Sequence, residues 1–149
     1  MPVIDETVTV PAPVPTVFSY LVDGENLPAW DSSIIECTRV AGAAEVAVGT
    51  RYAGVSRIMG KRLPWTTEVV EHTPDRSATS RSVEGSLSFT ATYEVEAVPG
   101  GTRVRYLLQA DSGLGGAFGK VMEPLVEKAQ TKVVRANLQH LVATFAKVA

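Results

Sequence analysis

The chain has 149 residues, of which 45% are hydrophobic, and this length and apolar content fit one globular domain with a buried core. Its 14 Lys and Arg residues against 16 Asp and Glu residues give a formal net charge of −2, without the basic run that follows a phosphate backbone, so we expect no nucleic-acid partner. No stretch approaches the roughly 20 apolar residues of a membrane-spanning helix, and the N-terminus lacks the features of a signal peptide. We therefore expect a cytoplasmic protein with no transmembrane segment, as a monomer or homodimer.

Few residues suit a metal or cofactor site. Cys37 is the only cysteine and is expected to act as a small buried hydrophobic side chain. The two histidines, His72 and His140, share no metal-binding spacing, and His72 is expected on the charged face of a strand. We therefore expect no metal and no cofactor.

The N-terminal part predicts a strand followed by two short helices. Residues Val3–Val10 alternate apolar and polar side chains, with the period of a half-buried strand. Apolar residues then recur at helical spacing from Pro13 to about Val22, where Asp23–Gly24 ends the helix. A second short helical segment is expected at Glu25–Ala29.

The middle of the chain predicts six more strands, and their short connections require antiparallel hairpins. They are expected at Ser33–Val40, Thr50–Ile58, Lys61–Thr73, Ser77–Glu84, Leu87–Val98 and Gly101–Ala110. From about Leu114 the apolar period changes to 3.6, which predicts one long amphipathic helix. Pro124 should bend this helix or end its first turns, because proline removes a backbone hydrogen bond.

The glycine-rich stretch 113–120 before this helix does not form a phosphate-binding loop. Leu114 stands in place of the first glycine, and Val121 replaces the Ser or Thr that would meet magnesium. Two interpretations remain open: a plain loop, or a flexible entry in which Leu114 or Phe118 acts as a lid.

The hairpin loops predict which side chains share a face of the sheet. Two-residue loops would pair Ile58 with Lys61, Thr73 with Arg76, Glu84 with Leu87, and Val98 with Gly101. These four pairings agree in placing nearly uncharged positions on one face. They place the following charged residues on the opposite face: Arg51, Arg57, Arg62, Glu68, Arg81, Glu94, Glu96, Arg103 and Arg105.

The uncharged face is unevenly filled, because several of its positions carry small residues. These are Gly54, Ala78, Ser80, Ser82 and Ala91. A close-packed core does not leave such gaps, so we expect an internal apolar cavity, with filling by side chains of the long helix as the alternative.

The same register sets Tyr52, Thr67, Ser82 and Phe89 side by side in one row. Their hydroxyl groups would either orient a bound molecule or satisfy one another and the backbone. Trp30 and Trp65 offer the same choice between stacking on a ligand and packing in the core.

The order of elements and several local phrases resemble the START-like helix-grip superfamily, which includes the polyketide cyclase/dehydrase type and the birch pollen allergen type. The phrases are Pro11-Ala12-Pro13 with Val17-Phe18, Asp23 to Asn26 with Pro28 and Trp30, Val48-Gly49-Thr50, Trp65 to Val70, Thr73-Pro74, and Gly100 to Val104. The resemblance covers the full length and implies a single domain over residues 1–149. The expected fold class is α+β: a seven-stranded curved antiparallel sheet gripping a long C-terminal helix, with two short helices between the first and second strands.

The resemblance implies binding or transport of lipid-like or polyketide-like molecules, and in some members cyclisation or dehydration. Members with cyclase activity are thought to use a Ser and an Arg on a central strand, and these positions fall at Thr67 and Val69 here. The missing Arg argues against the cyclising chemistry. The candidates for catalysis are Thr67 and Glu71, the latter because it follows Val69 in the inward series.

We therefore expect a protein that binds a small hydrophobic molecule without catalysis. The alternatives are a polyketide cyclase or dehydratase acting in the same cavity, and an interaction module that holds an apolar segment of a partner protein. The expected ligand-binding residues are Tyr52, Gly54, Ser56, Trp65, Thr67, Val69, Ser80, Ser82, Phe89, Ala91, Tyr93, Tyr106, Leu108, Leu114, Phe118, Met122 and Leu125.

Overall fold

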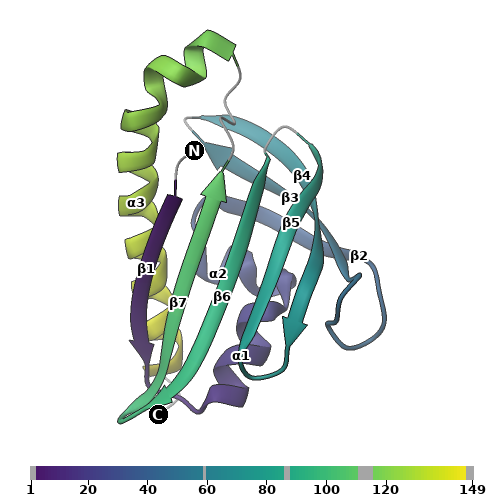
Figure 1. Cartoon of the computed structure of the whole chain (residues 1–149), viewed down its shortest axis with the longest axis vertical. Coiled ribbons are helices and arrows are strands. Elements are labelled where there is room, and N and C mark those ends of the chain that lie inside the picture. The colour runs from purple at the N-terminus through teal and green to yellow at the C-terminus, as the bar shows by residue number, and fades with distance from the viewer. Residues whose placement is uncertain (1–2, 59, 86–87, 111–115, 147–149) are drawn as a thin grey trace.

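The computed structural model describes residues 3–58, 60–85, 88–110 and 116–146, with the backbone alone for residues 110, 116–127, 129 and 130. Seven antiparallel strands form one curved sheet in the order β1-β7-β6-β5-β4-β3-β2, and the long helix α3 runs along its β1 edge (Figure 1). The elements are β1 (Val3–Val10), α1 (Val14–Val22), η1 (Gly24–Asn26), α2 (Leu27–Trp30), β2 (Ile34–Ala41), β3 (Arg51–Ile58), β4 (Lys61–Thr73), β5 (Ser77–Gly85), β6 (Phe89–Val98), β7 (Gly101–Ala110) and α3 (Gly116–Ala146). The predicted α+β fold is confirmed.

The short helices and α3 cover one face of the sheet, which we call the inner face. Helix α1 contacts β6 and β7, α2 contacts β2 and α3, and α3 contacts β1. Helix α3 continues through Pro124, and its first turns run in a different direction from the rest (Figure 1). Its C-terminal half buries Val134, Leu138 and Leu141 at the predicted helical spacing.

Among the side chains that the structure describes, the buried apolar ones form two clusters, and Leu27 packs against both. The larger cluster joins α1, α2, α3 and the β1 side of the sheet, with Trp30 and Leu138 among its buried members. The smaller cluster lies at the β2 end and consists of Cys37, Tyr52, Trp65 and Val69. Cys37 is thus a buried small side chain, and burial raises its pKa to about 12.

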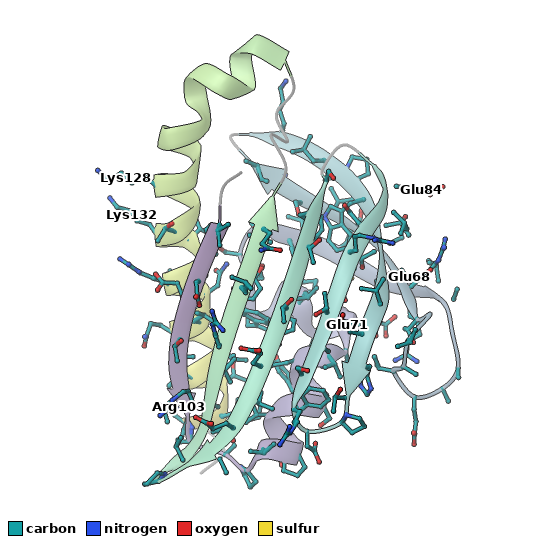
Figure 2. The ribbon with its side chains drawn as sticks, in the orientation of Figure 1. Glu68, Glu71, Glu84, Arg103, Lys128 and Lys132 are labelled. Carbon is teal, nitrogen blue, oxygen red and sulfur yellow. The ribbon has the colours of Figure 1, made fainter. Side chains whose placement is uncertain are left out.

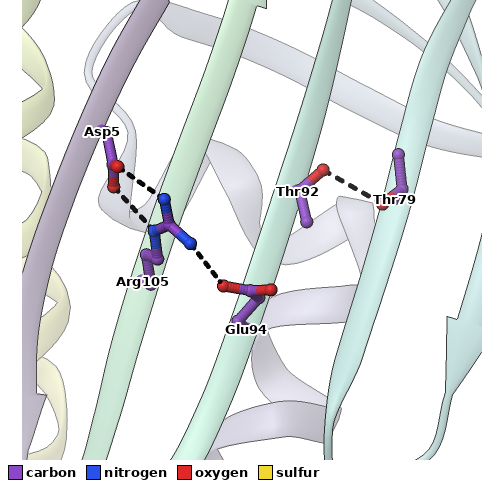
Figure 3. A network of polar contacts seen from close by, with 5 residues as sticks. All are labelled: Asp5, Thr79, Thr92, Glu94 and Arg105. Atoms are coloured by element: carbon purple, nitrogen blue, oxygen red, sulfur yellow. Dashed lines mark hydrogen bonds and ion pairs between the residues drawn. The ribbon is translucent and has the colours of Figure 1, made fainter.

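The outer face carries the charged side chains, as predicted. Arg105 donates two hydrogen bonds to Asp5 at 2.9 and 2.6 Å and a third to Glu94 at 3.0 Å, linking three neighbouring strands (Figure 3). The hydroxyls of Thr79 and Thr92 are 3.0 Å apart on the same face. At its described positions the inner face of β3 to β7 carries no Asp, Glu or Arg, and its one Lys is the exposed Lys61, which lies at the start of β4 opposite Ile58.

The predicted register is confirmed at two loops and wrong at a third. Ile58 pairs with Lys61 and Val98 with Gly101, while the pairing of Glu84 with Leu87 lies outside the described residues. Farther along the same hairpin, β5 and β6 keep the predicted offset, with Ser80 opposite Ala91.

Between β4 and β5 the loop has three residues, so Thr73 pairs with Ser77 instead of Arg76. Asp75 in this loop has a φ of 59°, a left-handed conformation that Asp tolerates better than most residues. The register is shifted by one residue until a β-bulge between Val69 and Glu71 restores the predicted offset, which holds as far as Thr67; a second shift then pairs Thr66 with Glu84.

This shift exchanges the faces of Glu71 and His72. Glu71 pairs with Thr79 of the outer face and is exposed (Figure 2), so its predicted inward position is wrong. His72 points inward instead, with its ring 5.5 Å from that of Phe18 on α1. A one-residue change of register turns every side chain it includes to the opposite face.

The exchange predicts unequal effects of two alanine substitutions. His72→Ala removes a ring contact with Phe18 and should lower the free energy of unfolding by about 1 kcal/mol, whereas Glu71→Ala should change it by about 0.5 kcal/mol or less. Urea denaturation of both variants at pH 7.5 measures the difference. A larger loss for Glu71→Ala would contradict the bulge.

Gly54 gives a second test of the packing. A Cβ atom there would lie 2.5 Å from the Trp65 ring and 2.9 Å from the carbonyl oxygen of Glu36. Gly54→Ala should therefore destabilise the fold by about 1–3 kcal/mol, since both neighbours are fixed. Arg57→Ala, at an exposed position of the same strand, is the control and should have little effect in the same urea titration.

Candidate functional site

The candidate site is the inner face of the sheet, where cross-strand rows bring the predicted residues together. Tyr52 pairs with Thr67, Thr67 pairs with Ser82, and the Ser82 hydroxyl accepts a 2.9 Å hydrogen bond from the Phe89 amide. The predicted row of these four residues is therefore confirmed. It crosses β3, β4, β5 and β6.

Two of the hydroxyls in this row have protein partners. Besides accepting from the Phe89 amide, Ser82 donates to the Phe89 carbonyl at 3.3 Å. Tyr52 donates to the Val22 carbonyl at 3.5 Å and lies against the backbone of Gly24. The Thr67 hydroxyl has no hydrogen-bond partner within the described residues, so it remains available to a bound molecule.

Trp65 closes the β2 end of the inner face. Its indole N–H donates to the Ser56 hydroxyl at 2.8 Å, and its ring lies over Gly54 and contacts the Phe89 ring edge-on at a centroid distance of 5.9 Å. Ser56 is therefore engaged by the tryptophan. Both Trp65 and Trp30 are buried, at 4% and 2% exposure, and pack within the core clusters.

Between the two core clusters lies a band of inner-face residues that are only half-buried. Leu108, Ala91 and Ser80 stand opposite one another on β7, β6 and β5, and Ser80 in turn pairs with buried Val69. The whole band consists of Ser80, Ser82, Phe89, Ala91, Tyr93 and Leu108. Partly accessible apolar side chains of this kind provide surface that an apolar molecule can cover.

A buried polar cluster joins α2 to α3 beside this band. The Oδ1 atom of Asp31 accepts hydrogen bonds from the Ser33 amide at 3.0 Å, the Ser33 hydroxyl at 2.6 Å and Asn137 Nδ2 at 2.9 Å. Asn137 Oδ1 in turn accepts from the amide and hydroxyl of Ser32. Burial raises the pKa of the Asp31 carboxyl, while the donors from Ser33 and Asn137 oppose that change.

Sequence reasoning missed this cluster. Asp31 and Asn137 are 106 residues apart, and neither belongs to a motif whose spacing would join them. The one local signal was a polar Asn137 between the apolar positions Val134, Leu138 and Leu141 of the helix.

The two tyrosines of the predicted site lie next to the same cluster. The rings of Tyr93 and Tyr106 stack at a centroid distance of 5.2 Å, and Trp30 meets Tyr93 edge-on at 6.2 Å. Burial raises the pKa of both phenols, and the negative charge of Asp31 raises them further.

Some predicted site residues lie outside the described part of the chain. These are Leu114 and the side chains of Phe118, Met122 and Leu125. Within the described residues, no three His, Cys, Asp or Glu side chains gather as a metal site would require. No described helix combines the length and apolar character needed to cross a lipid bilayer.

Comparison with known proteins agrees with this geometry. The family model described as "Polyketide cyclase / dehydrase and lipid transport" matches residues 1–146. The chain belongs to this family. It therefore has the START-like helix-grip fold that its sequence resembles. No curated protein matches the chain.

Solved structures show the same fold in family relatives. TTHA0849 from Thermus thermophilus is 24% identical with a TM-score of 0.84, and a START superfamily protein from Mycobacterium smegmatis is 17% identical with a TM-score of 0.77; each match covers 99% of both chains. The di-domain ARO/CYC BexL is 18% identical with a TM-score of 0.70, covering 96% of this chain and 46% of that one.

The Asp31–Asn137 contact yields a pH-dependent prediction. Asn137→Ala removes a donor to a buried carboxylate and should lower the free energy of unfolding by about 2–3 kcal/mol at pH 7.5. The ordinary pKa of an Asp carboxyl is 3.8, and the pKa of Asp31 is raised above it in the folded protein. The contribution of Asp31 to the free energy of unfolding therefore falls as the pH rises from 3.8 through the folded-state pKa. Losing the donor raises that pKa further, so the penalty should be smaller at pH 4, where a larger fraction of the carboxyl is protonated than at pH 7.5.

Urea titrations of the wild type and Asn137→Ala at both pH values measure this difference. Gln139→Ala, at an exposed position of the same helix, is the matched control and should have little effect at either pH. An equal penalty at pH 4 and pH 7.5 would mean that the amide does not act on the ionised carboxylate.

Proposed function

We propose that this protein binds or transports a small apolar molecule, lipid-like or polyketide-like, between the inner face of the sheet and α3. The observation that carries the proposal is the half-buried band between the two core clusters. Its apolar members are Phe89, Ala91, Tyr93 and Leu108. Each Å² of their apolar surface that a ligand removes from water stabilises the complex by about 25 cal/mol. Membership of a family described by lipid transport supports the same assignment.

The low number of charged side chains on the described inner face, where Lys61 at the start of β4 is the exception, also favours an apolar guest. Charged groups buried by a ligand would each cost several kcal/mol unless they were paired. The hydroxyls of Thr67 and Ser82 interrupt the apolar surface and give a bound molecule a small number of orienting contacts.

Fluorescence titration with the neutral apolar probe N-phenyl-1-naphthylamine tests the proposal. The wild type should bind the probe saturably, and Ala91→Trp should reduce its affinity at least about tenfold by filling the middle of the band. Thr90→Trp, at the neighbouring outer-face position, is the matched control and should leave affinity within about twofold. No saturable binding by the folded wild type would refute the proposal.

A second candidate function is a polyketide cyclase or dehydratase acting on a molecule in the same place. It is favoured by one observation, the buried Asp31 carboxyl next to Trp30, whose contact with Tyr93 brings it to the inner face; burial raises the pKa of this carboxyl, which is the direction that general acid catalysis requires. Val69 stands where the resemblance places a catalytic Arg, which weighs against cyclisation.

Turnover of a linear polyketide thioester, followed by mass spectrometry, separates the two functions. The enzyme hypothesis expects loss of turnover in Asp31→Asn and in Thr67→Ala while probe binding persists. Unchanged substrate in the presence of the wild-type protein supports binding alone.

A further inference from the structure

Four polar groups lie together at the α2 side of the inner face without hydrogen-bond partners in the described part of the chain. Three of them are Trp30 Nε1, which is fully enclosed, and the hydroxyls of Tyr93 and Tyr106. The fourth is Asp31 Oδ2, since all three donors to this carboxyl reach Oδ1. Among the described residues, Trp30 Nε1 is the one fully enclosed side-chain polar atom without a partner, so the unpaired oxygens of Tyr93, Tyr106 and Asp31 remain open to a bound molecule.

These groups are close neighbours. Trp30 directly precedes Asp31 and touches the ring of Tyr93, which stacks on Tyr106. The negative charge of Asp31 also raises the pKa of both phenols, which agrees with this chain of contacts. Tyr93 also belongs to the half-buried band, so the polar groups adjoin the proposed binding surface.

The chemistry of the groups defines the partner that fits them. Each phenol offers an O–H donor, and Asp31 Oδ2 offers an acceptor. A ligand hydroxyl matches both, because it accepts from a phenol and donates to a carboxylate; a keto oxygen matches the phenols alone. A ligand carboxylate or phosphate would instead place a second negative charge beside Asp31 in a poorly solvated site.

We propose that Tyr93, Tyr106 and Asp31 form the polar end of the ligand site and select apolar molecules ending in a neutral hydroxyl or keto group over fatty acids and phospholipids. This inference rests on the proposed binding function. It assigns the contacts to the phenols and the carboxylate, since Trp30 Nε1 is enclosed by protein.

Competition against N-phenyl-1-naphthylamine at pH 8 tests the proposal with two matched competitors, 1-decanol and decanoate. Any apolar site prefers the alcohol, so the readout is how each variant changes the ratio of the two inhibition constants. Asp31→Asn removes the negative charge and should improve decanoate binding about tenfold with a smaller change for decanol.

Tyr93→Phe and Tyr106→Phe each remove one donor and should weaken decanol about fivefold relative to the probe, which offers the phenols no hydroxyl or keto oxygen. Tyr20→Phe is the control, since Tyr20 packs against Phe145 at the α1–α3 contact, and it should change neither competitor. Urea titration of each variant confirms that it is folded.

The outcomes separate this proposal from the function on which it rests. If the probe binds but Asp31→Asn leaves the ratio within twofold, or both phenylalanine variants bind decanol as the wild type does, the polar end is refuted and apolar binding stands. If the wild type does not bind the probe, both proposals fail.

Discussion

The hydrogen bond from Asn137 to Asp31 fixes where α3 lies against the inner layer of the molecule. Apolar contacts of Val134, Leu138 and Leu141 would tolerate small shifts along the helix axis, because they have no direction. A buried carboxylate with three donors on one oxygen does not tolerate such shifts. The C-terminal half of α3 is thereby tied to the residues that end and follow α2, and this attachment fixes its position in the inner layer.

An ion pair at the edge of the sheet acts at the same level of the helix. Arg135, two residues from Asn137, pairs with Glu6 of β1, whose side chain is largely covered. An exposed ion pair of this kind adds little to the free energy of unfolding, and its role here is to fix the position of α3 against β1. Helix α3 is thus held to α2 on one side and to β1 on the other by residues of a single turn.

The sequence predicted the fold and most of the inner face, because both depend on local periodicity and loop length. Alternation within the strands identified the faces, and the two-residue loops before Lys61 and Gly101 carried the register correctly. The prediction for the third loop was wrong because its one additional residue does not change the apolar period of the flanking strands. Asp75 of this loop adopts a left-handed conformation. The wrong register misplaced Glu71 as a candidate catalytic group.

The polar cluster was beyond reach of the same reasoning. Contact between Asp31 and Asn137 depends on how α3 crosses α2, which is a property of the assembled layers and not of any segment. The row from Tyr52 to Phe89 was predicted, yet the partners of its hydroxyls were not. Whether Ser82 bonds to a ligand or to the Phe89 backbone depends on distances of a few tenths of an ångström.

The bulge at Val70 also affects how this hairpin tolerates change over evolutionary time. It absorbs the offset of an odd-length loop within the few residues from Glu71 to Thr73, so Thr67 and Val69 keep their orientation. An insertion or deletion at the hairpin tip is therefore compensated before it reaches the inner-face positions Thr67 and Val69. The length of that tip can then vary between related sequences without turning these side chains to the outer face.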